Sequence, residues 1–126
     1  MERRLAAILA ADVAGYSRMM AANETATLAA LQRDRSEVVA FAVARHHGRV
    51  VKLMGDGILA EFPGVVEAVD CAVKVQREMA QRNDGLPDDD RITFRIGVHV
   101  GENRCGWANS CARFSLWWRR DGRVSP

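Results

Sequence analysis

The sequence predicts an α+β fold whose elements follow the order β–α–β–β–α–β. Short apolar runs bounded by glycine or proline mark three of the strands, and a segment of strict apolar–polar alternation marks the fourth. Two longer segments between them repeat their apolar residues every three or four positions, as an amphipathic helix does. A glycine–aspartate–glycine segment joins two of the apolar runs in the manner of a β-hairpin.

The first predicted strand spans residues 5–11, a continuous apolar run that is followed by Asp12 and Gly15. Its alanines would also suit a helix, so periodicity alone does not decide between the two. The length of the run and the Gly-Tyr-Ser segment that follows it favour a buried strand leading into a loop.

Two amphipathic helices are predicted. The first spans residues 23–47, with Asn23 as its N-cap and Gly48 as its end. Its predicted apolar stripe consists of Leu28, Leu31, Val38, Phe41 and Ala42. The second begins after Pro63 and closes in the polar turn at residues 83–90. Its predicted stripe consists of Val65, Val69, Ala72, Val73, Gln76, Met79 and Ala80, with Cys71 close to it as a small core residue.

Residues 50–54 and 58–62 are the predicted hairpin strands. We expect a type I′ turn at Asp-Gly, in which both central residues have positive φ. The last strand, residues 92–100, turns every second residue toward a buried face: Ile92, Phe94, Ile96, Val98 and Val100. Together these elements give a ferredoxin-like plan, with an antiparallel-containing sheet and helices on one face.

The composition is that of an ordinary globular protein. The 126 residues fit one domain, with 48% hydrophobic and 27% charged residues and a net charge of +2. This charge is too close to neutral to indicate a nucleic-acid or membrane partner. The three cysteines form no CxxC pair, which favours a reducing compartment. The N-terminal apolar run only reaches the lower length limit of a signal sequence before Asp12 ends it, which disfavours a signal peptide. No segment has transmembrane length, so we expect a cytoplasmic protein.

The character of the sequence changes after Gly101. Residues 103–126 hold all three tryptophans and two of the three cysteines, and they contain five arginines but a single acidic residue, without any sustained period. We therefore expect residues 1–102 to form the domain and residues 103–126 to be an atypical, disordered tail. A nucleic-acid or membrane-surface patch is the less favoured interpretation of these aromatic and basic residues.

Two aspartates point to chemistry. Asp12 follows the first strand and Asp56 lies at the hairpin tip, next to that strand in the predicted sheet. Two carboxylates close together repel each other unless a cation lies between them, which indicates Mg²⁺ or Mn²⁺. The loop after the first strand leads into a short helix, and its backbone N–H groups could hold a triphosphate: Val13, Ala14, Gly15, Tyr16 and Ser17. The alternative is structural, with Asp56 shaping the turn and Asp12 capping a helix.

Three segments carry a family resemblance: ILAADVAGYSRMM, HGRVVKLMGDGILAEF and FRIGVHVGE. In their order and spacing they resemble the class III adenylate/guanylate cyclase catalytic domain, closest to bacterial adenylate cyclases, over residues 3–102. The resemblance implies that Asp12 and Asp56 bind two Mg²⁺ or Mn²⁺ ions and that Lys52 contacts the purine and favours adenine. It also implies conversion of ATP to cyclic AMP and pyrophosphate, by a homodimer or by pairing with another cyclase domain. In such a dimer the lysine comes from the other chain.

The sequence departs from the family after Glu102. The helix that supplies a ribose-orienting asparagine and a charge-stabilising arginine is missing, and Asn109 and Arg113 match only its spacing. We interpret the chain as a truncated or frame-shifted cyclase and expect it to have little or no activity by itself. The alternative is a non-catalytic nucleotide- or metal-binding module, or a dimerisation module. A diguanylate cyclase is disfavoured, because the hairpin carries GDG rather than GG[DE]EF.

Overall fold

The structure, a computed structural model, describes residues 4–103. It confirms the predicted α+β class and the predicted succession of strands and helices. The elements in chain order are β1 (Arg4–Val13), α1 (Tyr16–Ala22), α2 (Glu24–Asp34), the π-helical segment η1 (Arg35–Ala40), α3 (Phe41–Arg45), β2 (Arg49–Met54), β3 (Gly57–Phe62), α4 (Val65–Asn83), the 3₁₀ turn η2 (Asp88–Asp90) and β4 (Phe94–Asn103).

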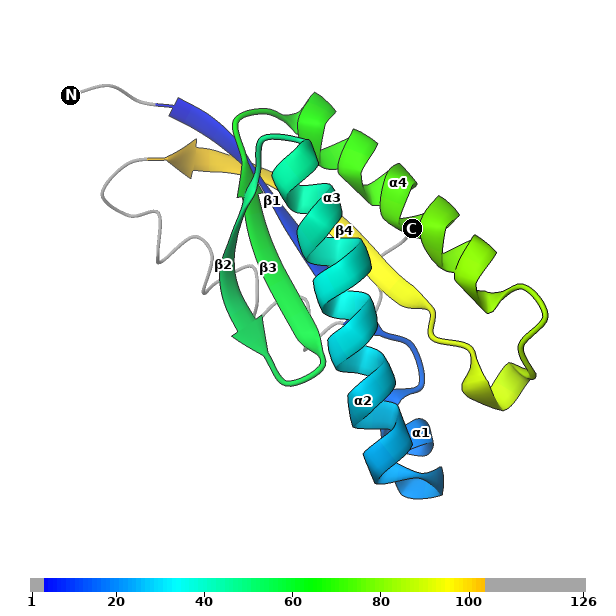
Figure 1. The fold of residues 1–126 in the computed structure, drawn as a ribbon. Coiled ribbons are helices and arrows are strands. Elements are labelled where there is room, and N and C mark those ends of the chain that lie inside the picture. Colours follow the sequence, from blue (N-terminus) through cyan, green and yellow to red (C-terminus); the bar gives the residue numbers. More distant parts are fainter. Residues whose placement is uncertain (1–3, 104–126) are drawn as a thin grey trace.

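The strands form one antiparallel sheet in the order β2-β3-β1-β4, and α2, α3 and α4 lie across one of its faces (Figure 1). The long apolar strand β1 is central and pairs with β3 on one side and β4 on the other. This is the single helical layer on an antiparallel sheet that the sequence predicts.

The core lies between the sheet and the helices. Alternate residues of β1 face the helical layer: Ala7, Leu9, Ala11 and Val13. They pack against a buried stripe of α4: Ala68, Cys71, Val75 and Met79. Burial raises the pKa of the Cys71 thiol to about 12, so this side chain is a neutral core residue at physiological pH, as predicted.

The predicted stripe of α4 is partly wrong. Val65, Val69 and Val73 are 46%, 45% and 43% exposed, and the buried face is rotated from them toward Ala68 and Cys71. Apolar residues occur on both faces of this helix, so periodicity does not determine which face is buried. The small side chains of Ala68 and Cys71 let the helix backbone approach the sheet more closely than a row of valines would.

The first predicted helix also differs from its prediction. Asn23 is the N-cap, since its side chain accepts a hydrogen bond from the Ala26 N–H at 3.1 Å. Leu31, Val38 and Ala42 are buried, whereas Leu28 and Phe41 are exposed. The helical run contains the π segment η1 and ends near His46, where His47 rather than Gly48 adopts a positive φ of 66°.

Gly48 is required because the backbone at the start of β2 passes close to the ring of Phe62. A Cβ built at Gly48 would lie 2.5 Å from a ring carbon of Phe62, so only glycine lets the start of β2 pass this side chain.

Pro63 follows the end of β3, as predicted. The strand β4 begins at Phe94, two residues later than predicted, with Ile92, Phe94 and Ile96 buried but Val100 exposed.

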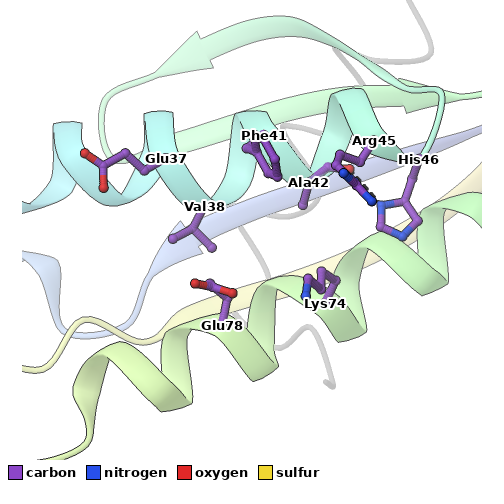
Figure 2. Close-up of a pocket in the computed structure, with 8 residues that line it drawn as sticks. All are labelled: Glu37, Val38, Phe41, Ala42, Arg45, His46, Lys74 and Glu78. Atoms are coloured by element: carbon purple, nitrogen blue, oxygen red, sulfur yellow. Dashed lines mark hydrogen bonds between the residues drawn. The ribbon is translucent and has the colours of Figure 1, made fainter.

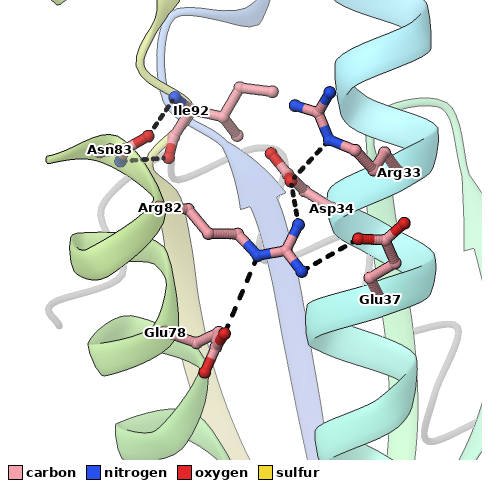
Figure 3. A network of polar contacts seen from close by, with 7 residues as sticks. All are labelled: Arg33, Asp34, Glu37, Glu78, Arg82, Asn83 and Ile92. Carbon is pink, nitrogen blue, oxygen red and sulfur yellow. Dashed lines mark hydrogen bonds and ion pairs between the residues drawn. The ribbon is translucent and has the colours of Figure 1, made fainter. Parts of the chain in front are cut away.

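A polar network joins the helices (Figure 3). The buried carboxylate of Asp34 accepts from Arg82 at 3.3 Å, and Arg82 also lies 3.0 Å from Glu37. The hydrogen bond to Glu37 is the main reason that the pKa of Arg82 lies above its ordinary value. The next residue, Asn83, exchanges two hydrogen bonds with the backbone of Ile92 and so fixes the approach to β4.

Within residues 4–103, no helix is both long enough and apolar enough to cross a membrane. The predicted domain boundary at residue 102 falls near the end of β4, which includes Asn103. The rest of the predicted tail lies outside the described residues.

The network predicts a stability effect at Arg82. Replacing Arg82 with alanine leaves the buried Asp34 carboxylate without its partner from α4 and should lower the free energy of unfolding by about 1–3 kcal/mol. Urea denaturation measures the change. Arg33, whose 56%-exposed side chain lies 3.5 Å from the same carboxylate, is the matched control. R33Q should lower the free energy of unfolding by less than about 1 kcal/mol. Equal decreases for the two variants would contradict the role of Arg82 as the main partner of Asp34.

Candidate functional site

The C-terminal end of β1 carries Asp12, which lies on the sheet face opposite the helices because Ala11 and Val13 face the core. Its side chain is only 8% exposed. The β1–β4 register sets Arg95 directly opposite Asp12. The guanidinium donates to both carboxylate oxygens, from Nε to Oδ1 at 2.8 Å and from Nη2 to Oδ2 at 2.7 Å. This bidentate pair compensates for the burial of the carboxylate.

The turn that carries Asp56 differs from its prediction. Met54 pairs with Gly57, so the two loop residues are Gly55 and Asp56 rather than Asp56 and Gly57. Of these two loop residues, Gly55 alone has a positive φ, of 55°, and the predicted type I′ turn is therefore wrong. A positive φ restricted to a glycine in the first loop position is the requirement of a type II′ turn. Glycine stands on both sides of Asp56, and only the strand register selects between the two possible loops.

The turn directs Asp56 toward β1. Its Oδ2 accepts a hydrogen bond from the Val13 N–H at 3.0 Å, across 43 positions of the chain. The pKa of Arg95 lies above its ordinary value, chiefly because of its hydrogen bond to Asp12, and the Asp56 charge adds to the effect. The structure thus brings both predicted carboxylates to the same end of β1 and within electrostatic reach of one guanidinium. Their role as metal ligands stays a prediction.

Two backbone amides of the predicted phosphate loop already donate hydrogen bonds to other groups of the chain. The Val13 amide donates to Asp56, and the Ala14 amide donates to the Thr93 carbonyl at 2.8 Å. The remaining candidate amides belong to residues 15–17, at the start of α1. Gly15 has a φ of 70° there, which favours glycine and turns the chain from the strand into the helix.

Lys52 is exposed on β2, the edge strand. It pairs with Leu59, which in turn pairs with Ala10, so Lys52 lies on the same sheet face as Asp12. Because β3 lies between their strands, the two backbones are separated by roughly 10 Å across the sheet. The structure therefore does not bring Lys52 to the carboxylates within one chain.

Asp12 and Asp56 are donors of the type that fits a Mg²⁺ or Mn²⁺ ion. No group of three or more His, Cys, Asp or Glu side chains that could hold a metal occurs among the residues described. Mg²⁺ is commonly bound by one or two carboxylates together with phosphate oxygens and water. Asp12 and Asp56 supply two carboxylates of this kind, and Arg95 shows that the site already accommodates a positive charge.

Sequence reasoning did not assign Arg95 to the site. Its signal was present in the alternation of residues 92–100, which turns Thr93, Arg95 and His99 away from the apolar face. The pairing of this strand with β1 decides that Arg95 meets Asp12, and that register is not encoded locally.

A separate groove of about 230 Å³ lies between η1–α3 and α4 (Figure 2). Phe41, Arg45, Lys74 and Glu78 are among its lining side chains. The groove belongs to the helical layer, whereas Asp12 lies on the opposite face of the sheet. It is therefore not part of the site formed by the aspartates.

Known proteins resemble this chain over most of its length. It is 48% identical over 102 residues to a protein of Rhizobium meliloti (strain 1021) named "Putative adenylate cyclase 3", an overlap that covers 81% of this chain and 17% of that protein. No protein-family model matches.

Solved structures show the same fold. An adenylate/guanylate cyclase/hydrolase from Silicibacter pomeroyi matches with a TM-score of 0.73 and 46% identity, covering 80% of this chain and 59% of the solved one. The guanylyl cyclase Cya2 matches with a TM-score of 0.67 and 27% identity, covering 80% and 56%. The chain thus spans between a half and two thirds of these solved structures and a sixth of the curated relative. In sequence and in fold, the chain belongs to the class III adenylate/guanylate cyclase family.

Proposed function

We propose that this chain provides the metal-binding half of an adenylate cyclase active site, which converts ATP to cyclic AMP and pyrophosphate in intracellular signalling. Asp12 and Asp56 would bind two Mg²⁺ or Mn²⁺ ions. The single observation that supports this most directly is the hydrogen bond from the Val13 amide to Asp56, which gathers both carboxylates at the end of β1. The adenylate cyclase named among the relatives supports the substrate class.

The proposed reaction is intramolecular. The ribose 3′-oxygen forms a bond to the α-phosphorus, the bond from that phosphorus to the bridging oxygen breaks, pyrophosphate leaves and the hydroxyl proton passes to solvent. When bound, the divalent ions would lower the pKa of the hydroxyl and stabilise the charge on the departing phosphates. Asp12 and Asp56 would hold these ions, and the amides of residues 15–17 would contact phosphate oxygens.

A second cyclase domain completes the proposed site. Lys52 would contact adenine, but it is separated from Asp12 by a whole strand within one chain. Its exposure on the edge strand, on the same face as Asp12, suits a lysine that serves the site of a partner. We therefore propose a homodimer, or a pair with another cyclase domain, acting in the cytoplasm without a nucleic-acid or membrane partner.

We propose that this chain alone converts ATP to cyclic AMP slowly. The sequence after Glu102 lacks the family's asparagine- and arginine-bearing helix. Removing one preorganised charge-stabilising donor from an active site commonly raises the barrier by about 3–4 kcal/mol. When two such groups are missing together, the loss of catalytic rate is not the sum of the two single losses, because groups that act as a unit have non-additive effects.

The proposed function predicts that the chain binds metal. With a non-hydrolysable ATP analogue present, calorimetry should detect Mn²⁺ uptake, and D12N and D56N should each weaken it by roughly tenfold or more, because each removes a charged ligand. The exposed Asp88 provides the matched control, and D88N should bind Mn²⁺ like the unchanged chain. Absence of uptake, or an equal loss in D88N, would refute the site.

Catalysis gives a second prediction. The purified chain with Mn²⁺-ATP should form little cyclic AMP, whereas its mixture with a cyclase domain whose metal-binding aspartates have been replaced should form it readily. The product is measured by chromatography. Turnover by the chain alone at the level of a complete domain would contradict the proposed impairment. No product from the mixture, with Mn²⁺ binding intact, would instead identify a non-catalytic module.

Arg95 gives a third prediction. The guanidinium occupies both oxygens of Asp12, so in the absence of nucleotide it should compete with a divalent ion for them. R95Q should therefore raise the Mn²⁺ affinity of the nucleotide-free chain by roughly fivefold. Arg49, which pairs with Glu61 on the same sheet face, is the matched control. Equal Mn²⁺ affinities of R95Q and R49Q would exclude this competition.

A further inference from the structure

We propose that Arg35 is a positioning residue for the candidate metal site, because it holds the hairpin tip that presents Asp56. Arg35 is the first residue of η1, and its Nη1 donates to the Gly55 carbonyl at 2.8 Å, twenty positions along the chain. Gly55 directly precedes Asp56 in the turn. The metal-related part of this proposal rests on the proposed function, whereas the contact with the hairpin does not.

Apolar packing leaves the hairpin incompletely supported at this point. An open hollow of about 320 Å³ lies between the helical run and the hairpin strands, lined by Arg35, Ser36, Leu53 and Ile58 among others. Leu53, near the end of β2, is 56% exposed although it lies on the sheet face that the helices cover. The helical layer therefore packs incompletely against this end of the hairpin, and the hydrogen bonds of the turn add to the position that strand pairing gives it.

Two hydrogen bonds hold the turn from opposite sides. Arg35 binds the Gly55 carbonyl from the helical layer, and the Val13 amide of β1 binds the carboxylate of Asp56. The positive φ of Gly55 allows one peptide to face the helix while the next side chain faces β1. If the first contact is lost, the second has to hold the turn alone, and Asp56 becomes less well placed relative to Asp12.

Arg35 stands where the helical run changes from α to π geometry. A π-helical segment contains an extra residue relative to an α-helix, and such segments occur often at functional sites. Here the segment begins at Arg35 and buries both Val38 and Val39 in the core. In the part of the chain that the structure describes, no carboxylate forms an ion pair with Arg35. Its charge therefore strengthens the hydrogen bond to Gly55 rather than a competing salt bridge.

The test uses the full chain with R35Q, R35K and the control R33Q, whose arginine lies on the same helical run but contacts Asp34. Hydrogen exchange of the Val13 amide is measured without metal, and Mn²⁺ affinity is measured with an ATP analogue. We expect R35Q to speed exchange at Val13 and to weaken Mn²⁺ binding, each by roughly tenfold. R35K, which keeps a charged donor, should recover part of both losses, and R33Q should resemble the unchanged chain.

Exchange at Leu9, in the middle of β1, separates positioning from general destabilisation. If R35Q leaves Val13 exchange unchanged, or speeds Leu9 equally, the positioning role is overturned. If the unchanged chain takes up no Mn²⁺, the proposed function fails, while exchange at Val13 still decides whether Arg35 holds the hairpin. Faster exchange at Val13 alone, with partial recovery in R35K, supports the proposal.

Discussion

The hydrogen bond between the Val13 amide and the Asp56 carboxylate determines how the two parts of the candidate site relate to each other. The paired residues of β1 and β3 end at Ala11 and Ile58, so the ladder itself does not reach the hairpin tip. The carboxylate extends the connection beyond the ladder by binding the backbone of the neighbouring strand. Asp56 therefore has a structural partner as well as a charge that it can offer to a cation, and neither role excludes the other.

The buried charge of Asp12 is a second constraint on this end of the sheet. A carboxylate as buried as that of Asp12 is costly unless a positive group or several donors compensate for its lost hydration. Arg95 provides this compensation because strand pairing sets it directly opposite. A positive charge beside Asp12 is thus a structural requirement of this end of the sheet. On the proposed function, a divalent ion would meet the same requirement when nucleotide is bound.

The arrangement also separates the proposed tasks of the site. Metal binding is assigned to the C-terminal end of β1 and the hairpin tip, whereas purine contact is assigned to Lys52 on the edge strand. One strand lies between them on the same face, so Lys52 does not contact the carboxylates within one chain. In a site shared between two domains, as proposed, the two tasks would fall to different chains.

The sequence by itself determined the order of strands and helices, the N-cap at Asn23, the hairpin position and the aspartates that end up together, because glycine, capping and periodicity signals act over a few residues. Only the tertiary structure decided which face of α4 is buried, which two residues form the turn, and that Arg95 binds Asp12 and Arg35 binds Gly55. These outcomes depend on strand register and on the fit of side chains between layers. Both arise from contacts between residues far apart in the chain, and local preferences do not specify them.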